Sequence, residues 1–383
     1  MRLLIISSEF PPGPGGIGNH AHQLALNLHR LGWDITIISP QDYASGEQAE
    51  RFNSAQPFRV IRVPSGRGRL REAFHRLWVA NRLAREHKPD VLLGSGLSGV
   101  WVASALAAIR RLPSAAVAHG SEFGMNRGIS GVINRWAYHR ASAVIAVSRF
   151  TRGVVEKAGI RPRRIEVIPN AADCKRFMVL PETERQAFRQ KAGFNGAPLL
   201  LTVGHVSERK GQEVVIRALP RILQKSPDTH YLMIGLPTLK EQLTQLAGQL
   251  GVRDRVHFLG AVTNDDMVRW LNCADVFVMT SRTTASGDCE GFGIAVVEAA
   301  LCGKPAVVSA QSGLIEAIQD GVTGIAVPEG DATATAEAVI SLLTDPTRCQ
   351  TMGAAAWDRA MREQTWETCA AKYDQLLREI IGP

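Results

Sequence analysis

The chain has 383 residues, 45% of them hydrophobic, and a formal net charge of +8 at pH 7. This length and apolar content are sufficient for two globular domains of common size. No run of eighteen apolar residues occurs, so the sequence predicts no membrane-spanning helix.

The start of the chain and the cysteines bear on its compartment. A single Arg2 and a short apolar run precede Ser7-Ser8-Glu9 without a cleavage site, so we predict a strand here and no signal peptide. The cysteines show no paired spacing typical of metal sites, and they are Cys174, Cys273, Cys289, Cys302, Cys349 and Cys369. We interpret them as reduced thiols of a cytoplasmic protein.

The positive charge lies in the first half of the chain. Residues 1–170 hold 23 lysines and arginines against 11 acids, whereas the remainder holds 21 against 25. The density of basic residues peaks between Arg59 and Lys88 and again from Arg149 to Arg164. This asymmetry predicts an anionic partner for the first half: a phosphorylated acceptor, an acidic lipid surface or nucleic acid. The alternative is that the charge serves solubility alone.

The first unit along the chain is predicted to be a strand, a glycine-rich loop and a helix. Gly13, Gly15 and Gly18 in this loop match the G-x-G-x-x-G pattern of dinucleotide-binding folds. An NAD-dependent dehydrogenase is therefore one alternative. Two features argue against it, because Phe10-Pro11-Pro12 separates the strand from the glycines and no acid directly follows the next strand.

A basic amphipathic helix is predicted over about residues 70–86. Apolar side chains alternate there with arginines, and they are Phe74, Leu77, Trp78 and Leu83. This combination is typical of helices at a membrane surface, because rings enter the acyl boundary while guanidinium groups meet lipid phosphates. The alternative is a surface helix that packs its apolar stripe on the sheet.

Strands predicted at residues 91–93 and 115–118 lead to a histidine. The second strand ends directly before His119-Gly120-Ser121-Glu122. Ligands of doubly wound sheets bind at the carboxyl ends of the strands, so His119 is a candidate functional residue. A structural histidine with satisfied hydrogen bonds is the alternative.

The second half of the chain repeats the alternation of strand and helix. Leu199–Val203 is predicted as its first strand, and a loop with Arg209 and Lys210 follows. Further strands are predicted at residues 230–234, 256–259, 276–280, 306–309 and about 324–326. This pattern is typical of parallel βαβ architecture. We interpret the polar residues 181–196 before it as a connector.

The stretch from Asp288 to Pro305 contains the most informative motif. Glu290 lies in a glycine-punctuated loop that opens onto an apolar helix, which Gly303 ends. Free N–H groups at the start of such a helix form a site for a phosphate or for hydroxyl groups. Glu298 is the single ionisable residue of the helix, and together the two carboxylates could bind vicinal hydroxyl groups. The alternative is a buried helix with one surface glutamate.

Glu290 and Glu298 with their glycines resemble the Glu-x7-Glu motif of retaining glycosyltransferase family 4. The resemblance implies the GT-B fold: α/β, with two Rossmann-like doubly wound domains that face each other across a cleft. It implies an N-terminal acceptor-binding domain at residues 1–175 and a nucleotide-sugar-binding domain at 176–364. A C-terminal helix, 365–383, would pack back on the first domain. The turn from Pro169 to Asp173 resembles the family's Pro-Asn-Gly-Val-Asp turn at this boundary.

For the second domain, the resemblance implies a donor site. Glu290 would contact a hydroxyl of the donor sugar, and Glu298 would bind the ribose hydroxyls. Lys210 and Arg209 would stabilise the leaving diphosphate electrostatically. The helix start would add backbone groups, those of Gly291, Phe292, Gly293 and Ile294.

Two positions of the second domain match the family less simply. The family usually carries arginine where His205 stands, and a neutral imidazole offers at most one donor, so Arg209 could compensate. The nucleobase would lie on the turn at Val262.

For the first domain, the resemblance implies contacts with the same donor. The backbone of Gly15 and Gly16 would approach the diphosphate, since a residue without a side chain allows that close contact. His119 would face the donor sugar near the developing oxocarbenium charge. Glu122 is a candidate for acceptor binding.

The predicted reaction moves a hexosyl group from a nucleotide-sugar to a hydroxyl of a glycan, lipid-linked or small-molecule acceptor, with retention. The donor would be of the GDP-mannose type or of the UDP-glucose or UDP-N-acetylglucosamine type. The loop from Arg282 to Asp288 looks like that of some GDP-mannose-using relatives. Without an Asp-x-Asp pair or a His/Cys cluster, we expect neither a metal ion nor another cofactor.

The predicted protein is cytoplasmic, either free or peripheral on the inner face of the membrane through its basic N-terminal half. A nucleic-acid partner is not expected. Two other classes remain open: the NAD-dependent dehydrogenase, and a non-enzymatic binder of anionic surfaces. A non-enzymatic binder of anionic surfaces would not need the paired glutamates Glu290 and Glu298.

Overall fold

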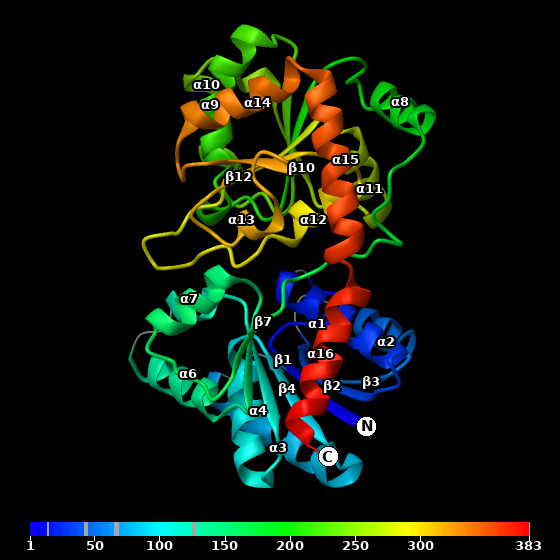
Figure 1. The fold of residues 1–383 in the computed structure, drawn as a ribbon, viewed down its shortest axis with the longest axis vertical. Helices are drawn as coiled ribbons and strands as arrows, with labels where there is room; N and C mark the ends of the chain where they lie inside the picture. The colour runs from blue at the N-terminus through cyan, green and yellow to red at the C-terminus, as the bar shows by residue number, and fades with distance from the viewer. Residues whose placement is uncertain (14, 42–44, 65–68, 125–127, 383) are drawn as a thin grey trace. The chain divides into compact units, whose positions relative to one another are not determined.

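The computed structural model describes residues 1–13, 15–41, 45–64, 69–124 and 128–382. Its internal contacts divide the chain into two α/β units (Figure 1). Unit 1 comprises Met1–Asn170 and Trp366–Pro383, and unit 2 comprises Ala171–Thr365. The chain therefore leaves unit 1 at the Pro169–Asp173 turn and returns to it at Trp366.

Among the described residues, unit 1 has a seven-stranded sheet in the order β3-β2-β1-β4-β5-β6-β7, and its neighbouring strands are parallel. The strands are β1 (Arg2–Ser7), β2 (Asp34–Gln41), β3 (Arg59–Pro64), β4 (Val91–Ser95), β5 (Ser114–Ala118), β6 (Ala143–Ala146) and β7 (Ile165–Val167). The strand order reverses between β1 and β4. The carboxyl ends of these two strands flank the position where ligands of doubly wound sheets bind.

Helices cover both faces of this sheet. They are α1 (Gly16–Arg30), α2 (Gly46–Ser54), α3 (Arg69–His87), α4 (Leu97–Arg110), α5 (Ser121–Gly124), α6 (Gly128–Arg140), α7 (Arg149–Lys157) and the C-terminal α16 (Trp366–Ile381). Helices α3, α4 and α6 pack side by side in that order, and α16 packs on α1. The buried faces of α3 and α4 meet apolar residues of β1, β2 and β4, which explains the 3.6-residue periodicity of these segments.

Among the described residues, unit 2 has a six-stranded parallel sheet in the order β10-β9-β8-β11-β12-β13. The strands are β8 (Leu199–Val203), β9 (His230–Ile234), β10 (Val256–Gly260), β11 (Val276–Met279), β12 (Ala306–Ser309) and β13 (Gly324–Val327). Here the order reverses between β8 and β11. The sequence therefore predicted the two doubly wound sheets correctly.

The helices of unit 2 surround a core of buried aliphatic side chains from α9, α14 and the central strands. They are α8 (Glu182–Lys191), α9 (Gln212–Lys225), α10 (Lys240–Gln249), α11 (Asn264–Cys273), α12 (Ile294–Leu301), α13 (Leu314–Ala317), α14 (Ala332–Leu343) and α15 (Pro346–Glu363), with 3-10 turns η1 (Glu208–Lys210) and η2 (Arg253–Arg255). The predicted connector at 181–196 was wrong in one respect, because it contains α8. No residue of α8 is buried, so its apolar periodicity is weak. Its signal is the charge pattern, with acids in the first turn and bases in the last.

Two chain-wide features accompany this fold. All six cysteines are free thiols. Over the described ranges, we find no helix with the length and apolar character needed to cross a membrane. The first apolar run of the chain is β1, whose residues Leu3–Ile6 are fully buried in the sheet.

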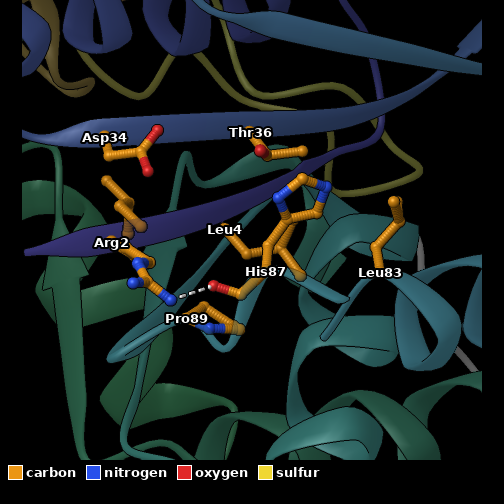
Figure 2. A pocket seen from close by; sticks show the side chains of 8 residues that line it. Arg2, Leu4, Asp34, Thr36, Leu83, His87 and Pro89 are labelled. Atoms are coloured by element: carbon orange, nitrogen blue, oxygen red, sulfur yellow. Dashed lines mark hydrogen bonds between the residues drawn. The ribbon is translucent and has the colours of Figure 1, made fainter. Parts of the chain in front are cut away.

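Figure 2 shows a small pocket at the opposite end of the unit 1 sheet from the switch point. It lies at the amino-terminal ends of β1 and β2, beside Arg2 and Asp34, and Arg2 donates a 2.9 Å hydrogen bond to the carbonyl of His87 there. Its volume of about 10 Å³ is the space of one water molecule. This pocket is therefore not a substrate site.

Candidate active site

Two loops at the switch point of unit 2 bring four charged side chains together. The loop after β8 supplies Arg209 and Lys210, and the loop after β11 supplies Asp288 and Glu290. Lys210 Nζ lies 2.6 Å from Glu290 Oε2, and Arg209 pairs with the same oxygen. Arg209 Nε lies 3.2 Å from Asp288 Oδ2. We call these four residues the ion cluster; it unites three of the residues that the sequence singled out and adds Asp288.

The ion cluster is mostly buried, and its charges control one another. Burial alone would raise the pKa of Glu290, but the charges of Lys210 and Arg209 outweigh it and hold that pKa below its usual value. Burial lowers the pKa of Lys210, and the attraction of Glu290 opposes this effect. Glu290 is therefore ionised at neutral pH and acts as a hydrogen-bond acceptor only.

Glycines make room for Lys210 at the end of β8. A Cβ atom on Gly204, whose φ is +148°, would lie 3.1 Å from Lys210 Cε. Gly211 has φ +69°, and a Cβ atom there would lie 1.9 Å from the carbonyl oxygen of Thr280. The positive φ angles and these contacts favour glycine at both positions of the loop that carries Lys210.

The loop after β11 ends at an uncapped helix start. Gly293 is the N-cap of α12, has φ +86°, and offers no side chain to the first turn. Gly291, Phe292 and Gly293 are buried, and the Phe292 ring belongs to the core. Ile294, half-buried, is the first residue of the helix. The first-turn amides of α12 thus lie next to the ion cluster in sequence.

Glu298 lies in the second turn of α12 and is buried. Burial raises its pKa to about 7, while the charges of Arg176 and Lys210 lower it and that of Asp173 raises it. Glu298 therefore shares its surroundings with Lys210. Arg176 and Asp173 were not predicted as site residues. Asp173 ends the Pro169–Asp173 turn, which we interpreted only as a boundary, and Arg176 follows three residues later.

Two further predicted donor-site residues, His205 and Val262, take no part in the ion pairs of the cluster. His205 is exposed, and its ring contacts the hydroxyl of Thr238 rather than an acid. Val262 is half-buried in the turn between β10 and α11, and β9 separates β10 from β8 in the sheet. Arg209, which the sequence proposed as compensation for His205, is held in the cluster by two acids.

In unit 1, His119 follows β5 and is half-buried at the switch-point end of the sheet. Its Nε2 lies 3.1 Å from the hydroxyl of Ser95, the last residue of β4. Its backbone N–H donates a 2.7 Å hydrogen bond to Glu122. Burial lowers the pKa of His119 to about 4, so the imidazole is neutral at physiological pH.

The sequence suggested Glu122 as an acceptor-binding residue, but the structure buries its side chain. It is 5% exposed, and Tyr138 of α6 donates a 2.9 Å hydrogen bond to its carboxylate. Asn134 donates to its backbone carbonyl. Burial raises the pKa of Glu122, and the bonds from His119 and Tyr138 oppose this. The carboxylate faces the interior because α6 covers it, and it holds the His119 turn.

The glycine loop of unit 1 ends at the start of α1. Gly15 is its N-cap, Gly16 is its first residue, both are exposed, and no side chain caps this helix. A Cβ atom on Gly15 would lie 2.2 Å from the carboxylate of Glu9, and one on Gly18 would lie 3.0 Å from Phe10 N. Glycine is therefore required for close packing of the loop. Glu9, a single acid without a motif, gave no sequence signal.

Comparison with known proteins gives the family. The model described as "Glycosyltransferase Family 4" matches residues 14–176, and that described as "Glycosyl transferases group 1" matches residues 184–359. The GDP-mannose-dependent alpha-(1-6)-phosphatidylinositol monomannoside mannosyltransferase of Mycolicibacterium smegmatis is 31% identical over 98% of both chains. The chain belongs to glycosyltransferase family 4. This enzyme is a nucleotide-sugar glycosyltransferase, which overturns the dehydrogenase and the non-enzymatic alternatives.

Solved structures give the fold of this family 4 enzyme. HepE of Anabaena, in complex with UDP and glucose, superposes with a TM-score of 0.83 at 22% identity, over 98% of this chain and 99% of that one. Sucrose-phosphate synthase of Thermosynechococcus elongatus gives a TM-score of 0.79 at 20% identity, over 99% and 98%. The predicted GT-B fold is confirmed.

Proposed function

We propose that this family 4 glycosyltransferase transfers mannose from GDP-mannose to a hydroxyl group of a lipid-linked acceptor, with retention and without a metal ion. The name of the M. smegmatis relative supports this donor and acceptor class. A second relative, the GDP-mannose-dependent monoacylated alpha-(1-6)-phosphatidylinositol monomannoside mannosyltransferase of Corynebacterium glutamicum, is 27% identical over 98% of both chains. The observation that carries the proposal is the ion cluster at the switch point of unit 2.

The ion cluster and α12 supply what a leaving diphosphate needs. Lys210 and Arg209 are two cations in a largely desolvated loop, where charges interact more strongly than in water. The uncapped start of α12 adds backbone donors and the positive end of the helix dipole. These fixed groups stabilise the charge that develops on the diphosphate, in place of a metal ion.

The two glutamates bind hydroxyl groups of the donor. Glu290 is ionised and already has a defined position through Lys210 and Arg209, so it accepts hydrogen bonds from the sugar without reorganising. Glu298 is the buried acid at the second turn of α12, where the ribose hydroxyls can donate to it. The raised pKa of Glu298 implies that ribose binding favours loss of its proton.

The chemical step needs no general base from the protein. The acceptor oxygen forms a bond to the anomeric carbon on the face that the leaving group vacates, and the bond between that carbon and the phosphate oxygen breaks. The acceptor proton passes to an oxygen of the leaving diphosphate. His119 is the residue of unit 1 that we assign to this step; it is neutral at physiological pH and adds no positive charge to a step in which the sugar gains oxocarbenium character.

Donor consumption tests this function directly. A panel of GDP-mannose, UDP-glucose and UDP-N-acetylglucosamine is incubated with a lipid-linked acceptor extract, and nucleoside diphosphate release is measured. We expect GDP-mannose to be consumed and Glu290→Gln to lower kcat by roughly a hundredfold. Glu337→Gln, an exposed partner of Arg221, is the control and should behave as wild type. Consumption of none of these donors would contradict the proposal.

Stereochemistry and metal independence have separate measurements. Proton NMR of the product reports the anomeric configuration, and we expect the configuration of the donor. Inversion would contradict the same-face attack. Transfer in the presence of excess EDTA should equal transfer with added Mg²⁺ or Mn²⁺, whereas loss in EDTA that added metal restores would contradict the electrostatic role of Lys210 and Arg209.

A lipid-linked acceptor also fits the outer surface of unit 1. Helices α3, α4 and α6 lie side by side on one face of its sheet (Figure 1). Large apolar side chains on this layer are exposed, Phe74 by 71% and Ile129 by 81%; the full set, which we call the basic apolar face, is Phe74, Trp78, Ile109, Ile129, Val132 and Trp136. Exposed arginines flank it, and neither α4 nor α6 contains an acid.

The occupant of the basic apolar face is an anionic lipid bilayer. On α6, residues Ile129, Val132 and Trp136 form a stripe at helical spacing with Arg135 beside it, so rings and cations face outward together. Aromatic side chains insert at the acyl boundary while guanidinium groups meet lipid phosphates. Such a surface would hold the enzyme where a lipid-linked acceptor is found.

Vesicle sedimentation separates this surface from the donor site. We expect the enzyme to pellet with vesicles of phosphatidylcholine and phosphatidylglycerol and not with phosphatidylcholine alone. The double variant Trp78→Ala/Trp136→Ala should lose most of this binding, while Trp357→Ala, an exposed tryptophan of unit 2, should keep it. Equal binding of wild type and double variant would exclude the basic apolar face as the contact.

A further inference from the structure

Four rings from three parts of the chain pack together around His20. We call them the His20 cluster: His20 of α1, His119 after β5, and Trp366 and Tyr373 of α16. His20 lies at the centre, with ring centroids 5.1 Å from His119, 5.5 Å from Trp366 and 5.9 Å from Tyr373. All four belong to unit 1, although Trp366 is the first residue after the chain returns from unit 2.

The geometry fixes the ring of His119 through two contacts. His20 meets it edge to face, with an interplanar angle of 86°, an arrangement that favours one ring orientation over others. In addition, His119 Nε2 lies 3.1 Å from the Ser95 hydroxyl. His20 is itself held by Tyr373, whose hydroxyl lies 3.2 Å from His20 Nε2.

A histidine at the centre of this cluster is unfavourable for the stability of the fold. His20 is 1% exposed, and its Nδ1 is a buried atom for which we find no hydrogen-bond partner among the described residues. A buried polar atom without a partner costs about 1–3 kcal/mol. A phenylalanine would fill the same space without that cost. A buried polar atom of this kind needs an explanation other than packing.

Burial also determines the charge states of His20, His119 and Tyr373. Burial lowers the pKa of His20 well below its usual value, and the neighbouring His119 lowers it further. Burial raises the pKa of Tyr373 well above its usual value, so the phenol keeps its proton. The three side chains are therefore uncharged, and they interact through ring packing and one hydrogen bond.

We infer that His20 is a positioning residue for His119, and that Tyr373 of α16 holds it in place. The inference rests on the proposed role of His119 in transfer. In this arrangement, the C-terminal helix sets the orientation of the His119 imidazole, so a displacement of α16 at Trp366 changes the rate of transfer. A misplacement of about 1 Å at a reacting group can cost roughly a hundredfold in rate.

The test removes the hydrogen-bonding pair and keeps the rings. In His20→Phe/Tyr373→Phe, both partners become apolar, so no new orphan polar group arises and stability should be equal or higher. We expect kcat to fall about tenfold or more, with a melting temperature no lower than that of wild type and an unchanged Kd for GDP. Long-range ¹H–¹⁵N NMR of histidine-labelled enzyme should show altered ring signals of His119. Tyr373→Phe alone, the milder change, should give an intermediate loss of kcat.

A matched control deletes a hydroxyl elsewhere. Tyr231 of unit 2 is also fully buried, and its hydroxyl lies 2.8 Å from that of Thr202. Tyr231→Phe should lower the melting temperature and leave kcat unchanged. If the double variant has wild-type kcat, or loses kcat only in proportion to lost fold, His20 has a structural role alone and the inference is overturned.

The outcome can be distinguished from failure of the proposed function. His119→Ala is measured beside the double variant. If His119→Ala keeps full transfer, the role of His119 is wrong and the inference loses its basis. If His119→Ala loses transfer while the double variant keeps it, only the positioning role of His20 is wrong.

Discussion

The ion cluster of unit 2 and the His20 cluster of unit 1 lie at the switch-point ends of two similar sheets. The two clusters differ in the kind of side chain that forms them. The ion cluster has two cations and two acids in two loops. The His20 cluster has uncharged rings from α1, α16 and the end of β5. The first cluster is charged, and the second is neutral.

The difference shows which kind of cluster can be recognised from a sequence. Charges at a helix start produce a short motif, because Arg209-Lys210 and Asp288…Glu290 are each local. The rings of the His20 cluster are spread from residue 20 to residue 373, and His119, which follows a predicted strand, is the single one that the sequence singled out. Only the fold joins them.

The largest expected effect is at the ion cluster. Lys210→Ala removes the cation closest to Glu290 and should lower kcat/KM for the nucleotide-sugar about a thousandfold, because the leaving charge loses a fixed partner. Steady-state kinetics measures this, and Lys191→Ala, exposed on α8, should be neutral. A loss below tenfold would mean that Arg209 alone stabilises the diphosphate.

His119→Ala should come next, with a loss of roughly a hundredfold in kcat and an unchanged Kd for GDP. The affinity is retained because the predicted partner of His119 is the donor sugar, which GDP lacks. Calorimetry and single-turnover kinetics separate the two quantities. Since the pKa of His119 is about 4, transfer should not show a step near pH 6.5 from this group, and such a step that disappears in His119→Ala would refute its neutral state.

Glu298→Gln should weaken GDP binding about tenfold at pH 8 and little at pH 6. The pKa of Glu298 is raised to about 7 from an ordinary 4.5, so the wild-type carboxyl ionises across this window and ribose binding releases its proton. Calorimetry in buffers of different ionisation enthalpy measures the release. Equal affinities of both proteins at pH 8 would exclude the ribose contact.

The same substitution has a predictable effect on stability. Because the folded pKa of Glu298 lies above its unfolded value, the free energy of unfolding falls as the pH rises from 4.5 to about 7. Glu298→Gln should remove this loss and raise the free energy of unfolding at pH 8 by about 3 kcal/mol at most. Urea unfolding at pH 5 and pH 8 tests it, and a variant less stable than wild type at pH 8 would contradict the burial of this acid.

The smallest effect is expected at Asp288. Asp288→Asn leaves Arg209 paired with Glu290 and removes only a partly exposed ion pair, so KM should rise by a few-fold with kcat nearly unchanged. Initial rates over a range of donor concentrations measure this. A loss as large as that of Lys210→Ala would show that Asp288, rather than Glu290, orients Arg209.

Sequence patterns predicted most of the fold because both sheets are parallel and their strands read as continuous apolar runs. The resemblance to family 4 placed Glu290, Lys210 and Arg209 in one predicted donor site, and the structure brings their side chains together. Sequence patterns missed α8, which buries none of its residues, and Asp288, an acid among loop residues. Glu122 was placed at the acceptor because a sequence does not show that Tyr138 of α6 covers it.

The central claim is that the ion cluster and the start of α12 hold the diphosphate of a nucleotide-sugar. A crystal structure of the enzyme with GDP tests it most directly. The account predicts phosphate oxygens within hydrogen-bond distance of Lys210 Nζ and of the Gly293–Ile294 amides, with the ribose at Glu298. Phosphates bound elsewhere, with Lys210 still paired to Glu290, would contradict it.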